Sequence, residues 1–368
     1  MPNTPKRIGI DARLIYQTGV GVYIRNFLYF LSQQYLTDVE FYIYASADDA
    51  AKFVTMNKEV AACKAFHFRE CEVKWHGIAE QTIFLGQLNQ DHLDLMHFTY
   101  FSWPALYRGR FIATVHDITP LTHATGRLSV QNPLWYRLKH YIFRLVFTRQ
   151  IMKAERLIVP TRAVEKEVMD YFKIPADKIT PIYEGLNFEF PRESVSPTLN
   201  YPYLLYVGNF YPHKNVDALI AAFTKVQEKG DFRLVLVGPE NYFSRELALS
   251  DRVILRTDVK SQDLADLYKH AYALVFPSFA EGFGLPIVEA MHFGTPLILS
   301  DIPVFREIAG DQAVYFDPHS VDSIHDMIQS VIHSVLINPL KPTHLDESKY
   351  SFRTMAEQTL KLYTDTTK

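Results

Sequence analysis

Short runs of apolar residues alternate along this chain with segments in which apolar residues return at helical spacing. Runs such as LVLV and ALVF are almost continuously apolar, as in parallel strands that are covered on both faces. Residues 215–229 instead place Val216, Leu219, Ile220 and Phe223 on one helical face. Candidate strands fall at residues 7–14, 40–45, 93–98, 111–116, 157–160, 179–183, 203–207, 233–237, 253–255, 273–277, 296–300 and 313–316.

This alternation of strands and helices occurs twice, which predicts an α/β protein with two Rossmann-like, doubly wound domains. Residues 191–202 are rich in proline and serine and lack periodicity, so they are the predicted linker. We expect an N-terminal domain at residues 1–190, a C-terminal domain at 203–345 and a final helical segment at 346–368. Two such domains facing each other leave a cleft, and ligands of such sheets bind beyond the carboxyl ends of the strands.

Composition and charge narrow the classes of protein. The chain is 48% hydrophobic and 21% charged, which is ordinary for a globular enzyme, and its net charge of −3 argues against nucleic acid as a partner. Cys63 and Cys71 lie outside any metal-ligand spacing and are expected to be reduced thiols. Because the sequence shows no leader peptide and no apolar stretch of about 20 residues, we expect a soluble, cytoplasmic protein.

The strongest chemical signal is the stretch SFAEGFGLPIVE, which follows a predicted strand. Gly282 and Gly284 leave the backbone bare, so its N–H groups can approach an anion at the start of the next helix. Glu281 lies in the turn, and Glu289, three residues past Pro286, falls in the predicted first helical turn. Two carboxylates around such a nest suit a ligand with hydroxyls on both sides of a diphosphate. The alternative is a plain strand–turn–helix in which the helix dipole favours Glu289.

Three further loops follow predicted strands. In YVGNFYPHKN, Lys214 stands at the entrance of a helix that Asn215 is expected to cap, where it would offset diphosphate charge, although a solvated lysine is the alternative. In TVHD, His116 ends a strand of the first domain, a position suited to catalysis, although structural histidines are commoner. In TGVGVY, Gly19 and Gly21 allow a tight turn into a helix.

These stretches, in this order, resemble the retaining family-four glycosyltransferases of GT-B fold. The likeness runs over nearly the whole chain, from TGVGVY through HFTYF, TVHDITPL, VPTRAVEKEV, PIYEGLN, YVGNFYPHKN and EGFGLPIVE to REIAGDQAVYFDP. The spacing of Glu281 and Glu289, with FGLP between them, is its most specific part. The pattern looks most like a subgroup that is rich in mannosyltransferases of bacterial surface polysaccharide assembly.

The resemblance implies an acceptor-binding N-terminal domain, a C-terminal domain that binds the nucleotide sugar, and a final helix that crosses back onto the first domain. Glu281 would hold a hydroxyl of the donor sugar, Glu289 the ribose hydroxyls and Lys214 the diphosphate. His116 would lie beside the donor sugar at the reaction centre. The other implied donor-site residues are Gly19 and Gly21, in a loop that closes over the phosphates or acceptor, Asn209, the base-binding Val259, Gly282, Phe283, Gly284 and Leu285.

Two positions depart from the family pattern: Asn209 stands where many relatives carry arginine, and Asn187 where aspartate is frequent. Because no Asp-x-Asp pair follows a strand, we expect neither a metal nor another cofactor, and Lys214 with backbone N–H groups would stabilise the leaving diphosphate. The expected reaction moves a hexose with retention, with mannose from GDP-mannose favoured, onto a saccharide or lipid-linked saccharide. No carboxylate nucleophile stands out in the first domain, which favours a front-face displacement.

Residues 127–153 combine basic and aromatic side chains and contain no acid. Such a helix fits an anionic membrane surface, where the acceptor would be lipid-linked and the protein would lie at the inner face of the membrane. The simpler interpretation is a long core helix with a solvated basic face.

Several other functions compete with this one. A UDP-sugar-dependent glucosyl- or N-acetylglucosaminyltransferase, or a non-catalytic protein that binds sugar nucleotides, would carry similar motifs. An epimerase or a phosphorylase on the same fold is a further alternative. A glycosidase would use Glu281 and Glu289 as acid and nucleophile, but their position beside Lys214 in a donor-like nest argues against it.

Overall fold

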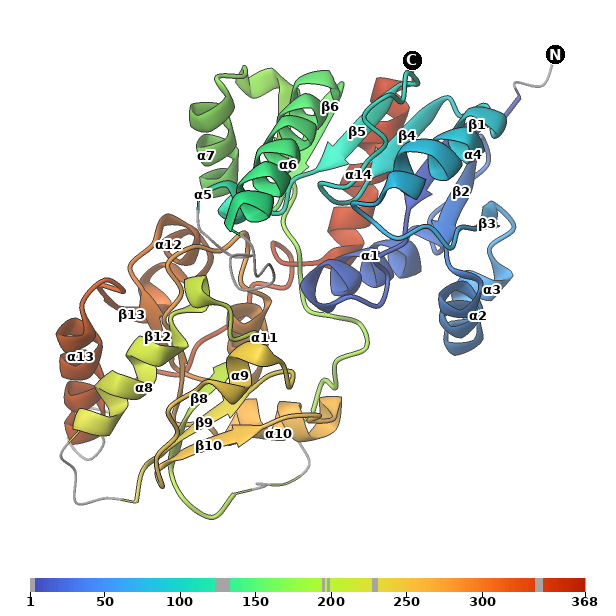
Figure 1. The fold of residues 1–368 in the computed structure, drawn as a ribbon. Coiled ribbons are helices and arrows are strands. Elements are labelled where there is room, and N and C mark those ends of the chain that lie inside the picture. The colour runs from blue at the N-terminus through green and yellow to red at the C-terminus, as the bar shows by residue number, and fades with distance from the viewer. Residues whose placement is uncertain are drawn as a thin grey trace. The chain divides into compact units, whose positions relative to one another are not determined.

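The computed structural model describes residues 4–122, 133–193, 196, 199–226, 231–334 and 340–367. The chain forms two compact units (Figure 1). Of the described residues, the first contains those at 4–121, 133–185 and 351–367, and the second contains Thr122 and those between Leu186 and Tyr350. Part of the predicted linker at 191–202 lies outside the described residues, and the described part belongs to the second unit.

The first unit is built on a seven-stranded sheet in which each strand pairs with its neighbours in parallel. The strand order is β3-β2-β1-β4-β5-β6-β7. Successive strands are therefore added on one side of β1 up to β3 and on its other side from β4 onward. The strands are β1 (Lys6–Asp11), β2 (Val39–Ala45), β3 (Phe66–Glu70), β4 (Leu95–Phe98), β5 (Phe111–Thr114), β6 (Arg156–Val159) and β7 (Ile179–Pro181).

Helices follow most strands of this unit, as parallel pairing requires. Side-chain caps begin three of them: Ser46, Thr161 and Ser351 accept hydrogen bonds from the backbone N–H three residues on. The helical segments are α1 (Thr18–Leu31), α2 (Ala47–Met56), α3 (Lys58–Ala62), η1 (Glu80–Phe84), α4 (Leu85–Gln90), α5 (Thr119–Thr122), α6 (Pro133–Lys153), α7 (Arg162–Phe172), η3 (Ala176–Lys178) and α14 (Phe352–Thr366).

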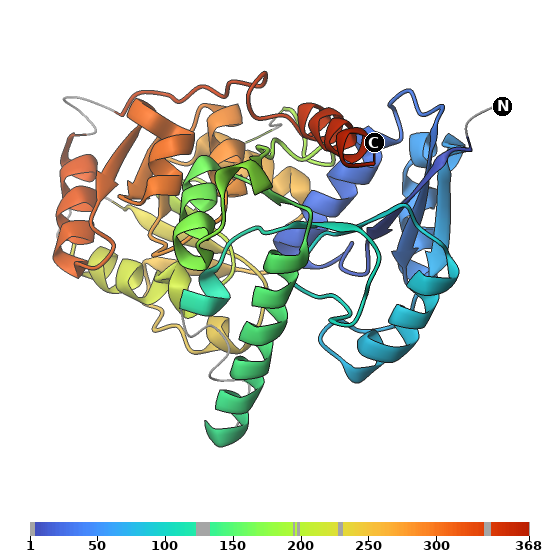
Figure 2. The ribbon, with the colours of Figure 1, turned by 90° about the horizontal axis from the view of Figure 1, so that it is seen from above.

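The last helix of the chain packs against the first one. α14 lies beside α1 in the first unit, and the two helices are also close in the view of Figure 2. Tyr363 of α14 is fully buried, and its hydroxyl lies 2.6 Å from Nδ1 of His97 on β4. The C-terminal segment therefore completes the core of the unit in which the chain begins.

The second unit is built on a six-stranded parallel sheet with the order β10-β9-β8-β11-β12-β13. Its strands are β8 (Tyr203–Val207), β9 (Arg233–Val237), β10 (Val253–Arg256), β11 (Ala273–Phe276), β12 (Leu297–Ser300) and β13 (Ala313–Phe316). Its helical segments are η4 (Pro212–Lys214), α8 (Val216–Lys225), α9 (Tyr242–Arg245), α10 (Ser261–His270), α11 (Leu285–Phe293), α12 (Pro303–Ala309), η5 (Gly310–Gln312) and α13 (Val321–Ser334).

Every predicted strand overlaps an observed one, and one observed strand was not predicted. β3 lies at the outer edge of the first sheet, and only Phe66 of its residues is buried. A helix within 215–229 is present as α8, and residues 227–230 lie outside the described part of the chain. Cys63 and Cys71 are both free thiols, and burial raises the pKa of each.

Among the described residues, no helix is both long enough and apolar enough to span a bilayer.

Candidate active site

The loops that carry the predicted donor-binding motifs leave one edge of the second sheet. Because β8, β10 and β11 run parallel, their carboxyl ends share that edge. Asn209 and Lys214 follow β8, Val259 follows β10, and Glu281 follows β11. β8 and β11 are neighbours although two strands separate them in sequence, so Lys214 and Glu281 flank the point where the strand order reverses. This point is where open α/β sheets bind ligands.

Lys214 and Glu281 form an ion pair across these two loops. Nζ of Lys214 lies 2.6 Å from Oε1 of Glu281, and Ser278 Oγ donates to the same oxygen at 2.7 Å. The lysine and glutamate side chains are only 16% and 10% exposed, so water screens their attraction weakly. A ligand that replaces this contact must offer anionic oxygens to the ammonium group and hydroxyl donors to the carboxylate.

Asn215 holds the loops around this pair in place. Its backbone adopts a left-handed conformation with φ of 58°, which asparagine tolerates better than most residues. Its Nδ2 donates to the carbonyls of Pro277 at 3.2 Å and Pro318 at 2.8 Å, in the loops that follow β11 and β13. Asn215 occupies the N-cap position of α8, as predicted, but its side chain makes no capping hydrogen bond. The backbone N–H of Phe279 also donates to the carbonyl of His213 at 2.9 Å.

The turn after β11 leads directly into α11. Gly284 precedes the helix with φ of 103°, a left-handed conformation that favours glycine. Since the helix begins at Leu285, Glu289 lies beyond its first turn, contrary to prediction. An attraction to the helix N-terminus, which fades after the first turn, therefore does not explain Glu289. Instead, Oε2 of Glu289 accepts a hydrogen bond of 2.7 Å from the hydroxyl of Tyr268 on α10.

Burial and a hydrogen bond have opposite effects on the pKa of Glu289. Burial raises the pKa of its carboxyl to about 7, while the hydrogen bond from Tyr268 acts in the opposite direction. Burial, followed by the adjacent carboxylate, raises the pKa of Tyr268 well above its usual range, so its hydroxyl remains a donor. A ligand that donates hydroxyl hydrogen bonds to Glu289 would favour the ionised form of this carboxyl.

The first unit carries His116 just beyond the carboxyl end of β5. Its Nε2 lies 3.0 Å from the carbonyl oxygen of Thr99, which follows β4, and its Nδ1 lies 3.5 Å from Oε1 of Glu184. The ring of Tyr23 on α1 packs edge-on against the imidazole, with centroids 4.9 Å apart. Glu184 follows β7 and is buried, and it was not among the predicted site residues.

A chain of buried hydrogen bonds lies behind this histidine. The Tyr23 hydroxyl is 3.0 Å from Oγ1 of Thr114, which is 2.8 Å from Nε2 of His97. Nδ1 of His97 meets the Tyr363 hydroxyl at 2.6 Å, so the chain joins α1, β5, β4 and α14. Burial lowers the pKa of His97 to about 3, so its ring is neutral. This network fixes Tyr23, and through it one side of His116.

Gly19 and Gly21 lie in the first turn of α1. The prediction that they belong to a loop is therefore wrong for this structure. Gly19 is exposed, whereas Gly21 is buried. The helix begins before the glycine pair, because hydrogen-bonded turns at residues 12–17 already connect β1 to it.

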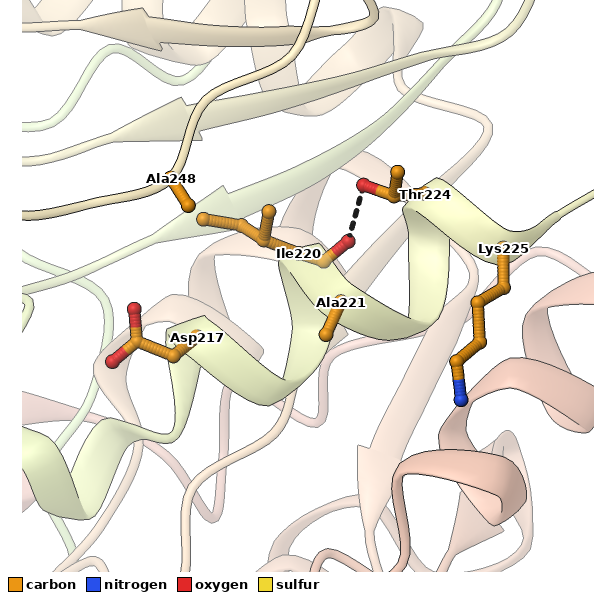
Figure 3. Close-up of a pocket in the computed structure, with 6 residues that line it drawn as sticks. All are labelled: Asp217, Ile220, Ala221, Thr224, Lys225 and Ala248. Carbon is orange, nitrogen blue, oxygen red and sulfur yellow. Dashed lines mark hydrogen bonds between the residues drawn. The ribbon is translucent and has the colours of Figure 1, made fainter.

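The remaining implied residues lie at the same edge of the second sheet. The backbone carbonyl of Asn209 accepts a hydrogen bond of 2.5 Å from the buried Tyr206 hydroxyl. Phe283 and Gly282 are buried, and Val259 and Leu285 are half-buried. Figure 3 shows a hollow beside α8, lined by Asp217, Ile220, Ala221, Thr224, Lys225 and Ala248. None of the predicted site residues lines that hollow, so we do not assign it to the site.

Within the described residues, no cluster of three or more histidine, cysteine, aspartate or glutamate side chains could hold a metal ion.

Solved structures with the same architecture cover almost the whole chain. A sucrose-phosphate synthase from Thermosynechococcus elongatus matches 98% of this chain and 98% of its own, with a TM-score of 0.72 and 17% identity. WaaG, a glycosyltransferase involved in lipopolysaccharide biosynthesis, matches 96% of this chain and 95% of its own, with a TM-score of 0.64 and 15% identity. With the two parallel-sheet units, these likenesses define a GT-B fold.

Two family models match consecutive parts of the chain. The family described as Glycosyltransferase Family 4 matches residues 18–190, and the family described as Glycosyl transferases group 1 matches residues 187–347. The protein is therefore a glycosyltransferase. It belongs to the glycosyltransferases in which a Family 4 domain is followed by a group 1 domain, and it resembles bacterial mannosyltransferases.

The relatives that carry this resemblance are moderately similar. The O-antigen chain mannosyltransferase RfbU of Salmonella typhimurium is 28% identical over 254 residues, which cover 64% of this chain and 70% of that protein. The O-antigen chain mannosyltransferase B of Escherichia coli is 31% identical over 176 residues, which cover 43% of this chain and 46% of that protein. The latter match thus spans about half of each protein.

Proposed function

We propose that this glycosyltransferase moves mannose from GDP-mannose to a saccharide or lipid-linked saccharide, with retention of the anomeric configuration. The observation that carries the proposal is the Lys214–Glu281 pair at the point where the second sheet reverses its strand order. A diphosphate supplies the oxygens that this lysine needs, and a hexose supplies the hydroxyls that this glutamate needs. The mannosyltransferase relatives favour mannose, and therefore GDP-mannose, over other donors.

In this proposal each side chain of the second unit has one task. Lys214 leaves Glu281 to bind the diphosphate, and Glu281 then accepts a hydrogen bond from a sugar hydroxyl. Glu289 accepts hydrogen bonds from the ribose hydroxyls. The backbone N–H groups around Gly284, at the start of α11, face the phosphate or sugar, where the helix dipole favours negative charge. No metal is assigned a role, because Lys214 and these donors compensate the charge of the leaving group.

The proposed reaction is a front-face displacement. The bond between the anomeric carbon and the phosphate oxygen breaks, and its electron pair stays with the departing GDP. The acceptor oxygen bonds to the anomeric carbon on the same face, and its proton passes to the leaving phosphate oxygen. Exclusion of water from the site limits wasteful hydrolysis of the donor.

The proposal is tested with GDP-mannose, UDP-glucose and UDP-N-acetylglucosamine as donors and a panel of mannosides and membrane-extracted lipid-linked saccharides as acceptors. We expect GDP release and mannosylated product from GDP-mannose alone, with an α-configured product by NMR, and activity that survives a metal chelator. Transfer only from a UDP-sugar would replace the donor, and an inverted product would refute the front-face reaction. Nucleotide binding without transfer to any acceptor would favour the non-catalytic alternative.

A membrane-bound acceptor is favoured by the outer face of α6. Leu138, Tyr141, Ile142 and Leu145 are all exposed and recur at helical spacing along it. Exposed basic side chains flank this apolar stripe: Arg137, Lys139, Arg144, Arg149 and Lys153. A core helix with a purely basic outer face does not account for the stripe, whereas an anionic membrane surface fits both kinds of side chain. Residues 127–132 of the predicted basic segment lie outside the described part of the chain.

We therefore propose that the enzyme works in the cytoplasm against the inner face of the membrane. Flotation with vesicles containing anionic phosphatidylglycerol should carry the wild-type protein upward, and vesicles of neutral phosphatidylcholine should not. The double substitution Ile142→Ser and Leu145→Ser should weaken this association, because it removes half of the exposed stripe. Equal flotation with both kinds of vesicle would contradict the electrostatic part of the proposal.

A further inference from the structure

We propose that the ion pair of Lys214 and Glu281 lowers the affinity of the site for the nucleoside diphosphate product relative to the nucleotide-sugar donor, and so favours product release. The inference rests on the proposed function for the two ligands, and it adds a role for the pair after the sugar has been transferred. Its structural basis is that the two side chains contact each other, so a ligand that binds one of them deprives the other of its partner.

Each of the two charged groups has few partners besides the other. Among the described residues, Glu281 is the only hydrogen-bond acceptor for Nζ of Lys214, at 2.6 Å. In the same part of the chain, the carboxylate of Glu281 receives one further hydrogen bond, of 2.7 Å, from the fully buried Ser278. Its side chain is only 10% exposed, so water can replace a lost partner poorly. The Tyr206 hydroxyl, whose pKa is raised by burial and then by the nearby charge of Glu281, already donates to the carbonyl of Asn209.

A nucleoside diphosphate satisfies only one member of the pair. Its phosphate oxygens can replace the carboxylate as acceptors for the ammonium group of Lys214. It carries no sugar beyond its terminal phosphate, so Glu281 keeps only the hydrogen bond from Ser278 and a poorly solvated negative charge. The terminal phosphate also carries a further negative charge near neutral pH, which repels the carboxylate. The carboxylate therefore opposes the binding of the diphosphate.

The nucleotide sugar satisfies both members of the pair. As Lys214 turns to the diphosphate, a hydroxyl of the hexose donates to Glu281 and takes the place of the ammonium group. The bond to the sugar also removes an ionisable oxygen from the terminal phosphate, which weakens the repulsion. Once the sugar has moved to the acceptor, Glu281 has lost this donor, and the ion pair re-forms only when the diphosphate leaves. The pair thus acts against the product more than against the donor.

The test is isothermal titration calorimetry of GDP and GDP-mannose, without acceptor, on the wild type, Glu281→Gln and Ser278→Ala. The neutral amide of Glu281→Gln releases the lysine and removes the charge that opposes GDP. The Kd of GDP divided by the Kd of GDP-mannose should therefore fall at least about tenfold, which is the size expected for one hydrogen bond to a charged group. GDP itself should bind this variant more tightly than it binds the wild type.

Ser278→Ala should change the same ratio in the opposite direction. It removes the one donor that stays with Glu281 after Lys214 has turned to the diphosphate. GDP therefore loses more affinity than GDP-mannose, whose hexose still donates to the carboxylate, and the ratio should rise at least about threefold. A variant that merely folded less well would bind both ligands more weakly and leave the ratio unchanged.

Asp231→Asn is the matched control. Asp231 is exposed and pairs with Arg233 at 2.7 Å, at the amino end of β9 and thus at the edge of the second sheet opposite the site. The change again replaces a carboxylate by an amide, and it should leave both dissociation constants unchanged. In transfer assays, GDP should inhibit Glu281→Gln at a lower concentration than it inhibits the wild type or Asp231→Asn.

Two results would overturn the inference. A ratio that is equal in the wild type and Glu281→Gln would show that the carboxylate does not discriminate between the two ligands, and a higher ratio in Glu281→Gln would show that it assists the diphosphate. The comparison needs no transfer. If a UDP-sugar proves to be the donor, the proposed donor fails, and the ratio measured with UDP and that sugar nucleotide decides the inference. Binding of none of these ligands to the wild type would refute both.

Discussion

Replacing Glu289 by glutamine should make the stability of the protein less sensitive to pH. Burial raises the pKa of this carboxyl from its ordinary value of 4.5 to about 7. A carboxyl with a raised pKa in the folded state contributes stability that is fully present below its unfolded pKa and is lost as pH rises through its folded pKa. The wild type should therefore lose stability between about pH 4.5 and about pH 7, because ionisation of Glu289 is less favourable in the folded protein.

The size of the effect follows from these two values. At about 1.4 kcal/mol for each pH unit, the whole difference corresponds to about 3 kcal/mol. Between about pH 5 and about pH 8, the free energy of unfolding of the wild type should fall by about 2.5 kcal/mol more than that of Glu289→Gln. Subtracting the variant from the wild type cancels groups that titrate in both proteins.

The assay is urea unfolding of wild type and Glu289→Gln at several pH values, without nucleotide. Glu246→Gln is the control, because it replaces an exposed carboxylate of the same unit by an amide. The wild type and the control should show the same pH dependence, and Glu289→Gln a flatter one. If the free energies of unfolding of the two glutamine variants change equally with pH, burial does not raise the pKa of Glu289. Nucleotide should also bind the wild type more tightly as pH rises through about 7, because ribose hydroxyls need the ionised carboxylate.

The other predictions concern the ion pair of Lys214 and Glu281 and the buried side chains of Asn215 and Tyr363. Lys214→Ala and Glu281→Ala should each reduce transfer at least about tenfold while circular dichroism stays unchanged, and full activity in both would mean that the site lies elsewhere. Asn215→Ala should cost about 1–3 kcal/mol of unfolding free energy, measured in urea, because two carbonyls lose their donor. Tyr363→Phe should lower the free energy of unfolding by about 1–2 kcal/mol, since it leaves buried His97 without one hydrogen-bond partner. An unchanged urea midpoint would show that the hydrogen bond between Tyr363 and His97 does not stabilise the protein.

The strands that could be predicted from sequence are those whose residues are buried on both faces. Runs such as 203–207 and 273–276 are buried almost throughout, so their apolar character is continuous. β3 escaped prediction because this edge strand contains no continuous apolar run and the apolar–polar alternation of FHFR covers only four residues. The location of the candidate site at the carboxyl edge of the second sheet could also be predicted, because each motif comes directly after a predicted strand.

The contacts within the site could be predicted only in part. Lys214 and Glu281 were expected near one ligand, but their direct pairing depends on the neighbouring positions of β8 and β11. Asn215 stands at the N-cap of α8, as its residue type suggested, but its side chain donates to two carbonyls that are distant in sequence instead of capping the helix. Glu184 was passed over because it meets His116 only through the pairing order of β5, β6 and β7.

The most direct test of the central claim is thermal unfolding of the wild type and Lys214→Ala with GDP, UDP and ADP. A nucleotide at about one hundred times its dissociation constant stabilises the folded state by about 2.7 kcal/mol, which raises the midpoint by several degrees. We predict a shift of the wild type with GDP alone, and a smaller one in Lys214→Ala at the same concentration. The absence of a shift with any of the three nucleotides would contradict a nucleotide-sugar site at this edge of the second sheet.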